Sequence, residues 1–85
     1  MPEISRFLGI VISMFHREHE RPHFHATYGE YKITVGIEDG VVRGRFPGRA
    51  LTLVLEWYQA HREELRENWK MARMGKPLRR IAPLE

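Results

Sequence analysis

Residues 23–46, "HFHATYGEYKITVGIEDGVVRGRF", decide the fold. They form three segments in which apolar and polar residues alternate, and two turn sequences separate these segments. An alternation with a period of two predicts strands that have one buried face. Gly29-Glu30 fits a type II′ turn, and Asp39-Gly40 fits a type I′ turn. The stretch therefore predicts three antiparallel strands joined by short hairpins.

A two-residue turn fixes which residues lie opposite one another in the sheet. A shift by one residue would move every side chain to the other face. With the first turn in place, every pair on one face is apolar, which supports this register. The opposite face is predicted to carry two rows of side chains: His23 with Gly36 and Arg43, and His25 with Thr34 and Arg45.

The flanking segments complete the predicted fold. Residues 7–15, "FLGIVISMF", are apolar on both faces and predict a fourth, central strand. Residues 47–75 predict one long helix, because apolar residues recur there at spacings of three and four. We expect a single domain over residues 1–85 of the α+β class. It consists of an antiparallel four-stranded meander (1–46), a long C-terminal helix that covers one face of the sheet (47–75) and an extended tail (76–85).

Composition limits the possible functions. The 85 residues contain no cysteine, which excludes disulfides and thiolate metal sites. The formal net charge is +3, and basic residues cluster at 43–49 and again at 70–80. Such clusters can neutralise phosphates. Taken alone, either cluster is better explained as a solvated surface that keeps the protein soluble. The apolar run 7–15 is too short to cross a bilayer, and no cleavage site follows it, so we expect a soluble cytoplasmic protein without a membrane segment.

The predicted histidine face suggests chemistry on RNA. Cleavage through the 2′-hydroxyl needs a general base, a general acid and a cation, and histidine and arginine supply these groups without a metal or other cofactor. The candidate catalytic residues are His23 and His25. The candidate nucleic-acid-binding residues are Arg43, Arg45, Lys32 and Thr34. The alternative is that solvated histidines only occupy the surface of the sheet.

The same histidines allow a metal-binding alternative. Two imidazoles on one strand face can ligate zinc, nickel or copper. The candidate ligands would be His16, His19, His23 and His25. No carboxylate or cysteine falls at a recognisable ligand spacing, however, and two arginines on the same face would repel a cation.

A third possibility is a surface for a protein partner. Trp57 lies beside the main apolar stripe of the predicted helix, where it could mark an interface or pack against the first strand or the tail. The tail carries apolar residues among basic ones and could fold back on the domain or order on binding. The candidate partner-binding residues are Trp57, Leu78 and Ile81, and the partner would be a cognate small protein or a second copy of the chain.

Four segments together resemble a family of small bacterial proteins catalogued as domain of unknown function 4160. They are "MPEISRFLGIVISMF", "PHFHATYGEYK", "LVLEWYQAHREELRENW" and the closing pattern G-K-P-L-x-x-I-x-P-L. The hallmark of the family, "PHFHA", corresponds to residues 22–26. The resemblance implies a gene context similar to that of toxin–antitoxin-like modules, and hence an RNA- or DNA-directed role or a protein partner.

These observations together give the functional expectation. It is a nucleic-acid-directed component of a toxin–antitoxin-type module, with a metal-independent ribonuclease as its most specific form. The alternatives are a non-catalytic interaction or dimerisation module and a histidine-based metal-binding protein. Whether the protein is an enzyme stays open.

Overall fold

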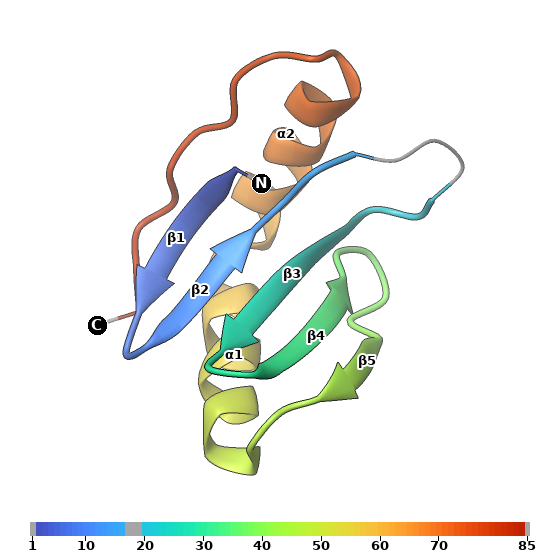
Figure 1. Ribbon diagram of the computed structural model, residues 1–85. Coiled ribbons are helices and arrows are strands. Elements are labelled where there is room, and N and C mark those ends of the chain that lie inside the picture. Colours follow the sequence, from blue (N-terminus) through green and yellow to red (C-terminus); the bar gives the residue numbers. More distant parts are fainter. Residues whose placement is uncertain (1, 17–19, 85) are drawn as a thin grey trace.

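The computed structural model describes residues 2–16 and 20–84, which form a five-stranded antiparallel sheet and two helices (Figure 1). The α+β class and the antiparallel sheet are confirmed. The strands pair in chain order, each with the next: β1 (Glu3–Phe7), β2 (Ile10–Ser13), β3 (His23–Tyr28), β4 (Tyr31–Gly36) and β5 (Val42–Arg45). Two helices follow, α1 (Gly48–Ala60) and α2 (Arg62–Arg73). Neither is long and apolar enough to cross a membrane.

The prediction of a single strand over residues 7–15 is wrong, because the chain reverses direction at Leu8-Gly9. Both residues have positive φ angles, 51° and 81°. A two-residue hairpin turn of type I′ requires positive φ at both central positions. Leucine is not a usual turn residue, so the apolar pattern predicts a strand where a hairpin forms. The sheet consequently has one strand more than the predicted four.

The register of the β3–β4 hairpin is confirmed. His23 lies opposite Gly36, and His25 lies opposite Thr34. The register of β4 and β5 differs from the prediction by two residues, since Thr34 lies opposite Arg43 and not Arg45.

The cause is a longer turn than the predicted Asp39-Gly40 pair. Gly36 N–H donates to Val41 O at 2.9 Å, and the Asp39 carboxylate accepts from Val41 N–H at 3.0 Å inside the turn. A displacement by two residues leaves every side chain on its predicted face.

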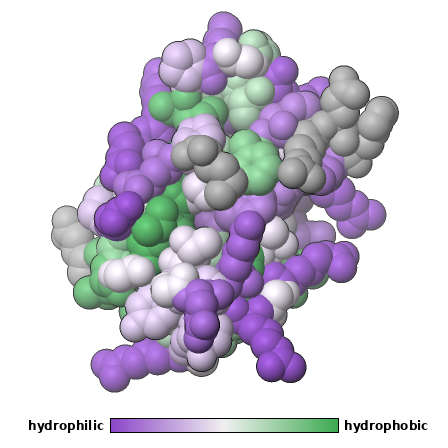
Figure 2. Space-filling view, viewed as in Figure 1, coloured by the Kyte–Doolittle hydropathy of each residue, from purple (hydrophilic) through white to green (hydrophobic). Residues whose placement is uncertain are grey.

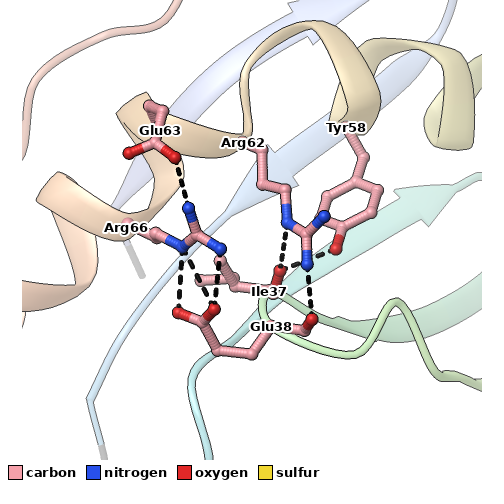
Figure 3. A network of polar contacts seen from close by, with 6 residues as sticks. All are labelled: Ile37, Glu38, Tyr58, Arg62, Glu63 and Arg66. Carbon is pink, nitrogen blue, oxygen red and sulfur yellow. Dashed lines mark hydrogen bonds and ion pairs between the residues drawn. The ribbon is translucent and has the colours of Figure 1, made fainter.

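The single helix predicted for residues 47–75 is interrupted at His61, which has φ −124° and ψ 23°. No proline or glycine marks this position, and the helical spacing of the apolar residues continues through it. The sequence pattern therefore predicts no interruption here. Side chains around the interruption bind the β4–β5 turn (Figure 3). Tyr58 Oη donates to Ile37 O at 2.6 Å, and the Arg62 guanidinium donates to Ile37 O and Glu38 O.

The Arg66 guanidinium continues this network. It pairs with the carboxylates of Glu38 and Glu63. The hydrogen bond from Arg66 lowers the pKa of Glu38 below its ordinary value. The network fixes the β4–β5 turn against the junction of the two helices.

The core lies between the sheet and the helices, which are behind the strands in the view of Figure 1. Its largest fully buried side chains include Phe24 from β3, Ile33 from β4, and Val54 and Trp57 from α1. Phe24 and Trp57 meet edge to face, with ring centroids 5.6 Å apart. Neither described helix covers the opposite face of the sheet, which is toward the viewer.

The tail folds back along the outer side of β1 (Figure 1). Ile81 N–H donates to Ile4 O at 2.8 Å, and Ile81 is buried. Asn68 of α2 holds the tail backbone twice, because its amide donates to Arg79 O at 2.9 Å and accepts from Arg79 N–H at 3.0 Å. Of the two alternatives for the tail, the structure therefore has the folded-back one.

Candidate functional site

Four neighbouring strands bring the candidate residues into rows on the open face of the sheet. The strand registers place Ser13, His25, Thr34 and Arg43 in one row across β2 to β5. The next row consists of Val11, Thr27, Lys32 and Arg45. His23, two residues before His25 in β3, lies opposite Gly36. The histidines and the cations thus share one surface, as the alternation predicts.

This surface is hollowed. A concavity of about 620 Å³ lies above β3, β4 and β5, and residues 20–22, which precede β3, also line it. Its lining includes both histidines and the cations Arg21, Lys32 and Arg43. Figure 2 shows this face with hydrophilic side chains extending from its lower right, over β4 and β5.

His23 is held by the segment before β3. Its Nδ1 lies 2.7 Å from Arg21 O, and a carbonyl oxygen can only accept, so Nδ1 carries a proton. Its Nε2 lies 3.4 Å from a carboxylate oxygen of Glu20. Nδ1 is thus bound to the backbone, and Nε2 is the ring nitrogen directed towards Glu20.

His25 forms part of the floor of the concavity and is only 8% exposed. The Phe15 ring stacks on its imidazole, with centroids 4.6 Å apart and an interplanar angle of 15°. The His23 ring contacts the His25 ring edge to face, with ring centroids 5.2 Å apart. His25 is thus packed between aromatic rings and is less accessible than a solvated surface residue.

The cations of β4 and β5 are exposed. Within residues 2–16 and 20–84, no carboxylate forms an ion pair with Lys32, Arg43 or Arg45. Arg21, at the rim of the concavity, lies 3.8 Å from the Asp39 carboxylate. The part of the face over β4 and β5 therefore carries uncompensated positive charge.

The structure does not bring the four candidate metal ligands together in the part that it describes. No three histidine, cysteine or acidic side chains of residues 2–16 and 20–84 are placed to hold one metal ion. His16 packs against Trp69, with ring centroids 5.3 Å apart, and His23 lies 5.4 Å from the same indole. His19 falls outside the described residues.

The expected partner residues lie mainly in the core. Trp57 is fully buried, packs against Phe7 of β1 at 5.8 Å between ring centroids, and donates from Nε1 to Ala82 O at 2.9 Å. Trp57 is therefore not an exposed interface residue. Of the two alternatives given above, the structure has the one in which the indole packs against the first strand and the tail. Ile81 is buried, and Leu78 is half-buried against the core.

Sequence reasoning missed four residues of the site: Ser13, Phe15, Glu20 and Arg21. Ser13 lies beside His25 because β2 pairs with β3, and Glu20 and Arg21 line the same concavity as the histidines. The sequence analysis places Phe15 only at the end of the apolar run 7–15, whereas its ring covers His25. No local turn signal fixes the register across this long connection.

Comparison with known protein families gives one match. The family model described as "Domain of unknown function (DUF4160)" matches residues 9–70, and the chain belongs to this family. The matched segment includes both histidines and all the cations of β4 and β5. Searches of the curated proteins and of the solved structures each gave no match.

Proposed function

We propose that this member of the DUF4160 family binds single-stranded RNA across the open face of its sheet. One observation carries the proposal: Lys32, Arg43 and Arg45 lack carboxylate partners in the described part of the chain, and Lys32 and Arg43 line a hollow that also contains both histidines. Cations that neutralise phosphates supply most of the affinity of proteins for nucleic acids. A place in a toxin–antitoxin-type module is proposed on the family resemblance alone.

The shape of the site favours a single strand over a duplex. Unpaired bases are bound by stacking on aromatic rings, while basic side chains follow the backbone. Phe15 and His25 form a stacked pair beside a hollow of about 620 Å³, which is in the size range of small-ligand pockets. Phosphates on either side of a bound base would reach the cations of β4 and β5.

Metal-independent cleavage is the more specific form of this proposal. His23 Nε2 is the atom suited to proton transfer, because Nδ1 is fixed on Arg21 O. Arg43 is on the same row as His25 and would stabilise charge on a phosphate bound between them. Since His25 is buried under Phe15, its expected role is to position the phosphate or His23.

Binding is tested with a fluorescent single-stranded RNA in the presence of EDTA. Arg43→Ala and Arg45→Ala should each weaken binding several-fold, because each removes a phosphate contact. Arg73→Ala, which removes an exposed arginine from the end of α2, is the matched control and should leave the affinity unchanged. Equal affinities for the wild type and both strand variants would refute the proposal.

Cleavage is tested with the same RNA on the wild type, His23→Ala and His25→Ala. If the protein is a ribonuclease, His23→Ala should lower the cleavage rate more than the affinity. Binding by the wild type without any cleavage would reject the ribonuclease and leave the binding function in place.

A further inference from the structure

The two edges of the sheet differ. The outer edge of β1 is bound by the tail through Ile81 N–H and Ile4 O. Among the described strands, β5 pairs with β4 alone and forms the other edge. An edge strand presents unpaired backbone groups to any extended segment that approaches it.

The outward groups of β5 can be identified from the hydrogen-bond pattern. Gly36 N–H donates to Val41 O, and bonded and non-bonded pairs alternate in an antiparallel ladder. Thr34 with Arg43 is then the next bonded pair, so Val42 and Gly44 direct their backbone groups away from β4. No described residue outside the sheet hydrogen-bonds to the backbone of either.

The side chains beside this edge form two different surfaces. Arg43 and Arg45 extend over the open face and are exposed. On the helix-covered side lies a groove of about 460 Å³. Its lining is mainly apolar and includes Ile33, Val42, Phe46 and Leu51, with Arg45 at its border.

Gly44 keeps this groove open. A Cβ atom at Gly44 would lie 2.5 Å from Lys32 O and 3.3 Å from Ile33 Cγ2, and the φ angle of 109° also disfavours any side chain. The edge therefore has a gap in its row of apolar side chains, into which a side chain of an added strand could pack.

We propose that β5 accepts an extended peptide strand from a partner protein, with acidic and apolar side chains in alternation. Successive side chains of an added strand point to opposite faces, so acidic residues would lie beside Arg43 and Arg45 and apolar residues would enter the groove. The charge argues against a second copy of β5 as the occupant. Two such strands would bring arginines next to arginines, and like charges on adjacent strands are destabilising.

The probe for this interaction is the peptide Val-Glu-Val-Glu-Val-Glu-Val, blocked at both ends. A peptide of the same composition with its valines and glutamates in separate blocks is the control. Titration calorimetry and amide chemical shifts of the full chain should give binding of the alternating peptide only, with the largest shifts in β5. No binding, equal binding of both peptides, or shifts confined to other elements would overturn the proposal.

Two variants of the protein test the edge itself. Val42→Pro removes an outward N–H at a position where an edge strand tolerates proline. Arg45→Glu reverses the charge beside the strand and keeps the backbone donors. Each should weaken peptide binding by about tenfold or more, whereas Arg73→Glu should not. Unchanged affinity in both β5 variants, with intact amide spectra, would refute the assignment.

The peptide site and the RNA site can fail separately. Val42→Pro removes no cation, so it should leave RNA affinity unchanged while peptide binding is lost. Parallel loss of both affinities in a folded Val42→Pro protein would mean that the edge is not a separate peptide site, and would count against the proposal.

Discussion

The indole Nε1 of Trp57 donates a hydrogen bond to Ala82 O at 2.9 Å, so a residue of the first helix holds the end of the tail. The second helix holds the same segment through Asn68 and Arg79. Both contacts lie between parts of the chain that no local pattern connects. They join both helices to the tail, and the tail in turn is bound to β1 through Ile81 and Ile4.

Asn68 should contribute to the stability of the fold through its buried hydrogen bonds to the tail. Its side chain is buried and makes two hydrogen bonds to the tail backbone. Asn68→Ala leaves the amide and carbonyl of Arg79 without these partners and should lower the free energy of unfolding by about 1–3 kcal/mol. Urea denaturation measures the difference. Glu67→Ala, at the exposed neighbouring position, should change it by less than about 0.5 kcal/mol, and equal effects of the two substitutions would contradict the prediction.

The β1–β2 turn contains a residue that can be improved. Leu8 has a φ of 51° and a side chain that is 66% exposed, so it is strained and loses little packing when replaced. Asn tolerates this conformation, and Asn-Gly is favoured in type I′ turns. Leu8→Asn should raise the free energy of unfolding by about 0.5–1 kcal/mol, whereas the β-branched Leu8→Val should lower it. A thermal melt that ranks the variants in the reverse order would contradict the assignment of the turn.

Acid should weaken the contact between β1 and the tail. The Arg6 guanidinium, and after it that of Arg80, lowers the pKa of Glu3 from 4.5 to about 2. A carboxylate whose pKa is lower in the folded state than in the unfolded chain stabilises the fold at pH values above the pKa of the unfolded chain. This contribution is lost as the pH falls towards the folded-state pKa of about 2. Glu3→Gln should therefore have a flatter decline in stability between pH 4.5 and pH 2 than the wild type. Glu30→Gln, in the exposed β3–β4 turn, is the control and should follow the wild-type curve.

Salt should distinguish phosphate contacts from other effects of the strand variants. Each cation that contacts a phosphate of single-stranded RNA contributes about 0.7 to the slope of log affinity against log salt. Lys32→Ala should reduce the slope by about this amount. Lys76→Ala removes an exposed lysine of the tail and should leave the slope unchanged. An unchanged slope for Lys32→Ala would remove this residue from the RNA surface.

Local chemistry accounts for what could be predicted from the sequence. The Gly29-Glu30 turn and the alternation around it gave the β3–β4 register correctly. The β4–β5 register was displaced because the Asp39 side chain closes a longer turn. The histidine–arginine face survived this error, since the displacement is an even number of residues. The stacking of Phe15 on His25 and the burial of Trp57 depend on long-range packing that periodicity does not encode.

The hydrogen bond between Ile81 and Ile4 has a consequence for assembly. A sheet with two open edges can grow in both directions and is a template for fibres. In this protein the tail covers the β1 edge, so among the described strands β5 is the one that leaves an edge of the sheet uncovered. If β5 binds a partner strand as proposed, the sheet is extended from that side and the β1 edge stays covered by the tail.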